Sequence, residues 1–310
     1  MNKDRIDILG KIVQASPMLA AIGEEQSFTK AAQRMNIDQS AVSHRIKSLE
    51  KSLGHALFDR TTRQLRFTEI GEILCKTAID SMGKWGNALE ALDRAQSTNS
   101  IRLSLSSSLA MKWILRALPR ADANGLSIAI DVKEDAVDFQ INEADAAIRF
   151  GPGPYPGMYS THLSHCWMQA VASPTYVSGQ DGNKSLLADP ETVILGDRRG
   201  EIDQTDFSWS YYLQKTGSEH SDFHVDHEFD RSDLMLQAAI SGMGVALGRT
   251  LLTEGDVVAG LLEEVGPPIR MRSSYWLVCS TSFSETKRFQ KLHDWLKVEI
   301  ECELKGVRLD

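Results

Sequence analysis

Five polar side chains recur at helical spacing between residues 39 and 47, and side chains of these types can recognise nucleic acid. Amide, hydroxyl, imidazole and ammonium groups reach base edges and phosphate oxygens. The spacing puts them on one face of a helix: Gln39, Ser40, Ser43, His44 and Lys47. A helical hairpin with a solvated face would have the same spacing, so the pattern alone leaves both interpretations open.

Two short helices separated by a tight turn must position this polar face. Ser27 or Thr29 can cap the first helix, and Asn36 stands where the turn needs a left-handed residue. Asp38 can cap the second helix, and Gly54 can end it. Apolar stripes on both helices allow them to cross closely: Phe28, Ala31, Ala32 and Met35, then Ala41, Val42, Ile46, Leu49 and Leu53. This order predicts a helix-turn-helix, whose second helix enters a major groove.

A winged extension is expected next. The stretch "ALFDRTTRQLRFTEIG" predicts strands at 56–58 and 64–67 around a polar turn, with Thr68 and Glu69 capping a new helix. Guanidinium groups on or beside this turn can clamp flanking phosphates or enter the minor groove. The candidates are Arg60, Arg63 and Arg66.

Composition and charge narrow the classes of protein. A chain of 310 residues suggests two or three domains. Residues 1–68 carry 11 Lys and Arg against 7 Asp and Glu, whereas the remainder carries 23 against 35. A basic head on an acidic body fits a head that meets a polyanion. The four Cys have no CxxC spacing, and the first residues lack the apolar segment of a signal peptide. We therefore expect a cytoplasmic protein without a disulfide framework.

Residues 27–71 resemble the DNA-binding head of the LysR-type transcriptional regulators. The words "SFTKAA", "QSAVSHRIKSLE", "LGHALFDR" and "LRFTEIG" stand in the family's order and spacing. The family usually has Pro at the position of Ala56 and often Gly at that of Gln26, which affects turns rather than the reading face. The reading face, the wing and the resemblance together predict these DNA contacts: Thr29, Arg34, Gln39, Ser40, Ser43, His44, Lys47, Arg60, Arg63 and Arg66.

The resemblance implies a winged helix-turn-helix head over 1–68, a linker helix over 69–97 and a two-lobed α/β effector domain over 98–310. This effector domain is similar to periplasmic solute-binding proteins. The resemblance also implies a homodimer or tetramer that binds double-stranded promoter DNA, acts through RNA polymerase and responds to a small-molecule effector. Apolar positions from Ile70 to Leu92 form a near-heptad seam typical of a dimerising helix, although a helix packed on its own body has a similar pattern. Before the head, an extra helix is expected, with a new helix starting at Ser16–Pro17.

Beyond residue 100, strands and helices alternate, which predicts a mostly parallel sheet with helices on its faces. Short helical and strand patterns include a helix at 138–144 and a strand at 223–229. We expect one lobe over about 98–171 and 269–310 and the other over about 172–268, with crossovers near Val171 and Pro268. In such folds a ligand binds in the crevice at the carboxyl ends of the strands.

Polar residues at strand ends are the candidates for an effector site. Hydroxyls and free N–H groups after the first strand suit an anion, although they could serve only as helix caps. Arg149 adds a cation, and we prefer an effector with one carboxylate because the body is acidic. The predicted set is Ser106, Ser107, Ser108, Arg149, Phe150, Ser232 and Tyr275.

Other chemistries fit the sequence poorly. The histidines His220, His224 and His227 resemble a metal cluster, but the last two would point to opposite faces of the expected strand. "GMGVALG" breaks the dinucleotide fingerprint at Leu247 and runs from helix to strand. No catalytic constellation is defensible, so we expect no enzyme, metal, cofactor or membrane partner. The alternative is a solute-binding protein or an enzyme with a helical head that binds no DNA.

Overall fold

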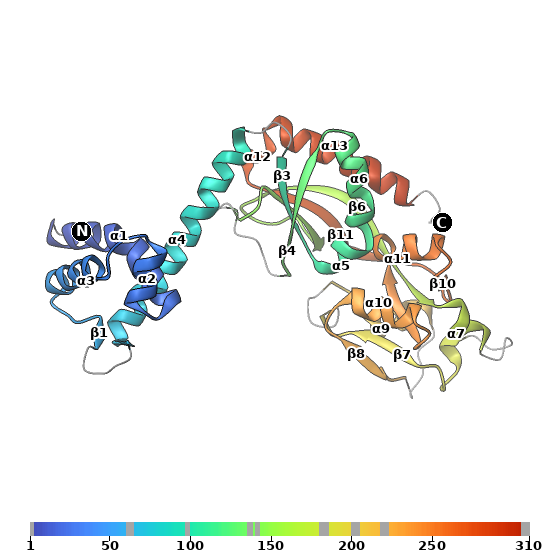
Figure 1. Ribbon diagram of the computed structural model, residues 1–310. Helices are drawn as coiled ribbons and strands as arrows, with labels where there is room; N and C mark the ends of the chain where they lie inside the picture. Colours follow the sequence, from blue (N-terminus) through green and yellow to red (C-terminus); the bar gives the residue numbers. More distant parts are fainter. Residues whose placement is uncertain are drawn as a thin grey trace. The chain divides into compact units, whose positions relative to one another are not determined.

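The computed structural model describes residues 3–59, 65–96, 100–134, 139, 143–179, 186–199, 205–217 and 223–304. The chain divides into two compact units, Met1–Asp93 and Arg94–Asp310, each of which is described by itself (Figure 1). The first unit contains three helices, a small two-stranded wing and most of a long fourth helix. The second unit is built on one nine-stranded sheet.

The head places the predicted helix-turn-helix in the predicted order. Helices α2 (Phe28–Arg34) and α3 (Gln39–Leu53) enclose a turn in which Asn36 has φ 52° and is left-handed, as expected. Ser27 caps α2 by accepting a hydrogen bond from the Lys30 N–H at 3.4 Å. Gly54 ends α3 at φ 72°. Asp38 occupies the N-cap position of α3, but its side chain makes no capping hydrogen bond, so this detail of the prediction was wrong.

Helix α1 (Lys3–Glu25) runs without interruption through Pro17, so the expected break at Ser16–Pro17 was also wrong. A proline inside a helix removes one backbone donor. Here the Ser16 hydroxyl donates to the Ile12 carbonyl at 3.0 Å, and residues after Pro17 are fixed in the core, including Leu19 and Ile22. By length and composition alone Arg5–Glu25 could cross a membrane, but its second half is the core of the head.

The wing is shorter than predicted in its described part. Strands β1 (Phe58–Asp59) and β2 (Arg66–Phe67) pair antiparallel, and residues 60–64, with Arg60 and Arg63, lie outside the described residues. The Glu50 carboxylate accepts the N–H groups of Leu57 at 2.8 Å and Phe58 at 3.3 Å, which ties α3 to β1. A half-buried carboxylate that accepts two backbone donors fixes the direction in which the wing leaves α3.

Helix α4 (Glu69–Gln96) begins and ends close to the predicted limits. Thr68 caps it by accepting the Gly71 N–H at 3.1 Å, as expected. At its start α4 packs against β1 so closely that a Cβ at Gly71 would lie 2.0 Å from the Leu57 carbonyl oxygen. Further along, its apolar seam is exposed, with Trp85 at 66%, Leu89 at 63% and Leu92 at 60%.

The sheet of the second unit has the strand order β4-β3-β5-β11-β6-β9-β7-β8, and β10 also pairs with β6. Parallel strands form both ends, and the antiparallel strands β6 and β11 run through the middle. The bounds are β3 Ser100–Leu105, β4 Ser127–Val132, β5 Ala146–Gly151, β6 Tyr159–Ala172, β7 Ile194–Asp197, β8 His227–Phe229, β9 Val245–Arg249, β10 Glu263–Glu264 and β11 Ile269–Cys279. Two α/β lobes therefore share β6 and β11, as Figure 1 shows: lobe one contains β3, β4 and β5, and lobe two contains β7, β8 and β9.

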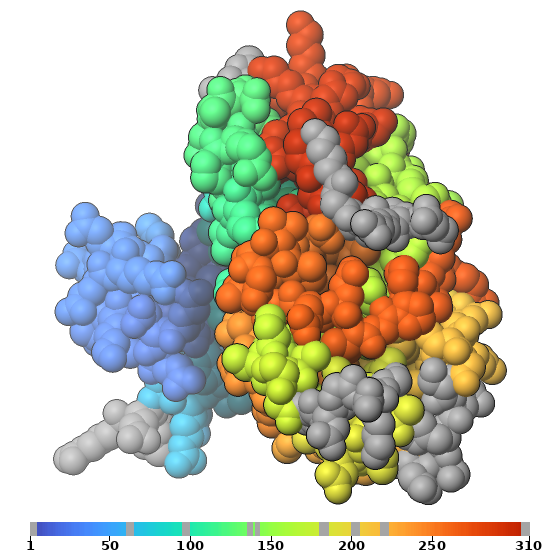
Figure 2. Space-filling view, turned by 90° about the vertical axis from the view of Figure 1, so that its right-hand side faces the viewer, coloured from blue at the N-terminus to red at the C-terminus, as the bar shows by residue number. Residues whose placement is uncertain are grey.

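Helices cover this sheet on both lobes. A continuous helical run, α5 (Ser107–Leu109), η1 (Ala110–Ile114) and α6 (Leu115–Ala123), follows β3. It packs against α11 (Thr250–Val258), which in turn packs against α13 (Lys287–Glu303), and these helices form one continuous surface in Figure 2. The buried Lys112–Asp256 ion pair, 2.9 Å long, joins η1 to α11. The other helices of the described residues are α7 Pro174–Ser178, η3 Leu186–Ala188, α9 Trp209–Thr216, α10 Ser232–Ile240 and α12 Thr281–Ser284.

The strand expected at 223–229 exists only at His227–Phe229, because the preceding residues lead into β8 as irregular backbone. Most of the helix expected at 138–144 lies outside the described residues.

Candidate functional site

The exposed face of α3 gathers most of the predicted base-reading residues. Val42, Ile46 and Leu49 are buried against the head, which turns the opposite side of the helix outward. Gln39, Ser40, His44 and Lys47 are exposed there, and Ser43 is half-buried beside them. Thr29 on α2 and Arg66 on β2 are exposed as well. This combination of polar reach and positive charge is suited to the edges and phosphates of a duplex.

Arg34 and Arg45 are two further exposed cations of the head, on α2 and α3. Arg34 was predicted to contact DNA, but its guanidinium pairs with Glu24 and, at 3.5 Å, with Glu25 at the end of α1. All three side chains are substantially exposed, so the pairs are weak and Arg34 can exchange them for a phosphate. Arg45 was missed, although it is an exposed cation on α3 itself.

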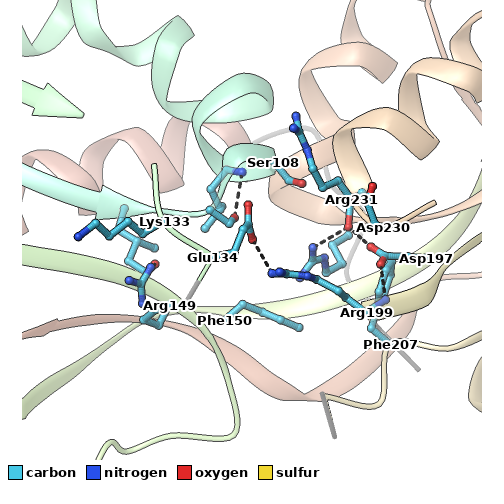
Figure 3. Close-up of a pocket in the computed structure, with 15 residues that line it drawn as sticks. Ser108, Lys133, Glu134, Arg149, Phe150, Asp197, Arg199, Phe207, Asp230 and Arg231 are labelled. Carbon is cyan, nitrogen blue, oxygen red and sulfur yellow. Dashed lines mark hydrogen bonds and ion pairs between the residues drawn. The ribbon is translucent and has the colours of Figure 1, made fainter. Parts of the chain in front are cut away.

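A cavity of about 140 Å³ lies between the two lobes of the second unit (Figure 3). Lobe one contributes residues that follow β3 and β4 or lie on β5, and lobe two contributes residues near the ends of β7, β8 and β9. This placement matches the carboxyl-end rule for open sheets. The lining residues are Ser106, Ser108, Leu109, Lys133, Glu134, Ile148, Arg149, Phe150, Asp197, Arg199, Phe207, Asp230, Arg231, Ser232 and Arg249.

Five of the seven predicted effector residues line this cavity: Ser106, Ser108, Arg149, Phe150 and Ser232. Sequence reasoning missed the second-lobe cations Arg199, Arg231 and Arg249. A signal was available for Arg249, because it ends a strand of the alternating pattern as Arg149 does.

Ser107, which was also predicted to contact the effector, is not among the residues that line the cavity. Its hydroxyl donates to Asp233 Oδ1 at 3.3 Å, and the Ser108 hydroxyl donates to the same oxygen at 3.0 Å. Burial raises the pKa of the Asp233 carboxyl, but hydrogen bonds from Arg231 and Ser108 outweigh this effect and hold the pKa below its usual value. These hydroxyls therefore fasten lobe one to α10 of lobe two.

The Glu134 carboxylate accepts a hydrogen bond from Ser107 N–H, one of the backbone donors after β3 that were predicted to bind an anion. Its Oε1 accepts the Ser107 N–H at 2.9 Å, and its Oε2 accepts Arg199 Nη1 at 3.1 Å. Glu134 follows β4 in lobe one, whereas Arg199 follows β7 in lobe two. This is a second contact between the lobes, and Figure 3 shows the ion pair spanning the cavity.

Two arginines supply fixed positive charge to the cavity. The Arg249 guanidinium lies between the rings of Phe150 and Phe207, 4.6 Å and 4.7 Å from their centroids, and Nη2 donates to Ser232 Oγ at 2.9 Å. Arg149 Nη2 donates to Ser104 Oγ at 3.1 Å, and burial lowers the pKa of Arg149. Two aromatic rings enclose the Arg249 guanidinium, and a serine hydroxyl accepts a hydrogen bond from each of the two arginines.

Tyr275 is fully buried and does not line the cavity, so its predicted role is also corrected. On β11 it pairs with Phe150 of β5 and Ser164 of β6. Its ring packs against that of Phe150 at 5.1 Å. Burial raises the pKa of the Tyr275 phenol well above its usual value. Tyr275 thus supports Phe150 from beneath.

The histidine group behaves as ordinary surface. His224 is exposed and lies 3.1 Å from Asp226, and His220 lies outside the described residues. Within the described ranges, no group of three or more His, Cys, Asp and Glu side chains could hold a metal ion.

Comparisons with known proteins agree on both units. The family model described as a bacterial regulatory helix-turn-helix protein of the lysR family matches residues 17–72, and the LysR substrate binding domain matches residues 94–300. The glycine cleavage system transcriptional activator of Escherichia coli K12 is 29% identical over 93% of both chains. The transcriptional regulator DsdC of the same strain is 31% identical over 76% of this chain and 77% of its own.

Among solved structures, HypT of Salmonella typhimurium, a hypochlorite-specific LysR-type transcriptional regulator, has the same fold. The TM-score is 0.55 at 16% identity, over 93% of this chain and 98% of that one. The relatives are transcriptional regulators, which favours regulation over a solute-binding protein or an enzyme. This chain therefore belongs to the LysR family of bacterial transcriptional regulators, which bind promoter DNA and small-molecule effectors.

Proposed function

We propose that this regulator reads its promoter with the exposed face of α3 and senses a small carboxylate in the cavity between its lobes. The observation that carries the effector part is the charge of the cavity. Cations on both lobes converge on a space of about 140 Å³, where Arg149 donates to Ser104 and Arg249 lies between the rings of Phe150 and Phe207. Such a site favours one small anion that touches both lobes.

The DNA part rests on the helix face and the wing. We assign base contacts to Gln39, Ser40, Ser43 and His44, and phosphate contacts to Thr29, Arg34 and Lys47. The wing adds Arg66, with Arg60 and Arg63 expected beside it outside the described residues. Phosphate contacts set register and affinity, and base contacts set sequence preference.

We place the functional boundaries at 1–68 for the head, 69–97 for the linker and 98–310 for the effector domain. The exposed seam with Trp85, Leu89 and Leu92 supports α4 as the dimer contact, since a stripe of this kind is costly in water. A dimer of this kind would present two DNA-binding heads to a two-fold DNA site. The bound protein would regulate transcription through RNA polymerase, in the cytoplasm. An assembly that is either a homodimer or a tetramer, and a chain without catalytic activity, are also part of this proposal.

Signalling follows from the bridging geometry. A ligand that contacts both lobes favours the lobe arrangement in which both contacts form, and it shifts the equilibrium by its differential affinity. The changed arrangement of the lobes in the effector domain would alter the spacing of the two DNA-binding heads and the bend of the DNA.

The test joins binding to transcription. Genome-wide mapping of bound DNA identifies a promoter, and its output is then measured with a panel of small carboxylates and their neutral amides. Arg149→Ala is expected to abolish the carboxylate response while leaving DNA binding intact. Lys215→Ala removes a cation that lies over Tyr211, outside the cavity, and should respond like the parent. A full response in Arg149→Ala would overturn the effector site.

A further inference from the structure

Glu134 makes the contacts that a bound carboxylate would make. One of its oxygens accepts a backbone N–H of lobe one, and the other accepts a guanidinium N–H of lobe two. An amide donor combined with a guanidinium is a strong two-point set for a carboxylate. In this state of the protein, the chain's own side chain satisfies that set.

We propose that Glu134 is a built-in competitor of the effector: an effector carboxylate binds by displacing the Glu134 carboxylate from Ser107 N–H and Arg199. This inference rests on the proposed carboxylate site and names its regulation. The charge of the cavity supports exchange over addition. A second carboxylate beside Glu134 would meet a like charge, whereas exchange leaves the number of negative groups at these donors unchanged.

The burial of the two lobe-to-lobe contacts supports exchange at Glu134 in particular. The contact of Asp233 with Ser107 and Ser108 is buried, so breaking it would remove two hydrogen bonds from a carboxylate that has little access to water. In contrast, the Glu134 side chain is 29% exposed and the Arg199 side chain is 51% exposed. An ion pair with that much access to water contributes little stability, and its partners can separate at small cost. The Asp233 contact therefore holds the lobes, and the Glu134 contact is the exchangeable one.

A competitor of this kind sets the threshold of the response. When the competent state is only fractionally populated, the apparent affinity falls by that fraction. If Glu134 occupies its donors about nine tenths of the time, the apparent affinity for a carboxylate is reduced roughly tenfold. Glu134 thus determines the effector concentration at which the regulator answers, without contacting the effector.

The test uses the full chain with acetate as the probe, acetamide as the neutral control and ionic strength held constant with sodium chloride. Acetate dissociation constants are measured from the shift in melting temperature of the wild type, Glu134→Ala and Glu134→Ala/Arg199→Ala. We expect Glu134→Ala to bind acetate roughly tenfold more tightly than the wild type. The double variant should lose this gain, and acetamide should produce no comparable shift.

A matched control is Glu228→Ala, which removes a carboxylate from an exposed ion pair with Arg198 outside the cavity. It should bind acetate like the wild type. If Glu134→Ala fails to fold, Glu134→Gln replaces it, since the amide keeps an acceptor for Ser107 N–H and loses the charge that holds Arg199. Glu134→Gln should also bind acetate more tightly than the wild type.

Equal acetate affinity in wild type and Glu134→Ala, or a gain that survives Arg199→Ala, would overturn the competitor. These results leave the proposed function standing, because that is judged by promoter output in Arg149→Ala. Loss of the carboxylate response in Arg149→Ala, with equal acetate affinities in the wild type and Glu134→Ala, would support the proposed function and overturn the competitor. Tighter acetate binding by Glu134→Ala, at a promoter whose output ignores every carboxylate, would support the competitor and contradict the proposed function.

Discussion

Asp233 and Ser108 bond to each other twice across the lobes. The Ser108 hydroxyl donates to Asp233 Oδ1 at 3.0 Å, and the Asp233 N–H donates to Ser108 Oγ at 3.1 Å. Because both residues are buried, the pair is a structural fastening of the effector domain, and its energy depends on the ionised carboxylate.

The pH dependence of stability should report this fastening. The pKa of Asp233 is lowered in the folded protein, so its contribution is present above the unfolded value near 3.9 and is lost as pH falls through the folded pKa. Wild-type stability should therefore drop below about pH 4. Asp233→Asn should be less stable at neutral pH by about 1–3 kcal/mol and should show a smaller acid-dependent loss. Urea unfolding at a series of pH values measures both effects. If the free energy of unfolding fell equally with pH in the wild type and in Asp233→Asn, the stabilising role of the ionised Asp233 would be contradicted.

Ser43→Ala and Gln39→Ala should relax sequence preference on the operator. Each substitution removes a side chain from the reading face of α3, with an expected cost of about 1–3 kcal/mol for the preferred half-site. Competition anisotropy against half-site variants measures the ranking. Ser52→Ala near the end of α3 is the control, since bases are read by the first turns of such helices. Unchanged ranking in both variants would move the reading face elsewhere.

The substitution Leu89→Glu should convert the protein to monomers. Leu89 belongs to the exposed seam of α4, and a buried charge in a dimer contact would be strongly unfavourable. Leu74 and Met82 are poorer targets, because both pack partly against the core of the head. Analytical ultracentrifugation measures the mass, with Lys84→Glu on an exposed part of α4 as the control. Persistence of dimers in Leu89→Glu would exclude this part of α4 as the contact.

Gly71→Ala should destabilise the protein by about 1–3 kcal/mol, because the new Cβ would lie 2.0 Å from the Leu57 carbonyl oxygen. Gly83→Ala lies on the same helix with no heavy atom within 4 Å of its new Cβ. It should stabilise by about 0.4–1 kcal/mol through lower chain entropy. Opposite signs in urea unfolding would support the close approach of α4 to β1. Equal effects would show that the backbone simply shifts.

Local signals explain which elements were predictable from the sequence. Asn36 and Gly54 mark backbone conformations that few residues adopt, so the turn and the end of α3 could be placed without a structure. The capping role of Thr68 at the start of α4 could also be predicted, because its hydroxyl bonds to the nearby Gly71 N–H. Pro17 misled the prediction because a proline usually starts or breaks a helix, whereas tertiary packing of the following turn carries α1 through it.

The candidate site depended on contacts that the sequence does not encode locally. Ser107 looked available because its partner, Asp233, stands far along the chain. Tyr275 looked available because the register of β11 against β5 decides which face of the sheet it occupies, and a one-residue difference reverses that face. Ser106, Ser108, Arg149, Phe150 and Ser232 reached the cavity because strand ends in open sheets gather at one edge.

The shared strands also decide how force passes between the lobes. Met168 of β6 pairs with Ile269 of β11 and with Arg249 of β9, so the ladder continues from one lobe into the other. A change in the angle between the lobes must then twist this ladder, because neither lobe can slide without breaking backbone hydrogen bonds. The pairing of β11 with β6 is irregular between Arg270 and Ser274 and again between Tyr275 and Trp276, so the regular ladder is interrupted at these two places. A change in lobe angle would therefore meet least resistance from the ladder at these interruptions, which flank Tyr275, the residue that packs against Phe150 of the cavity.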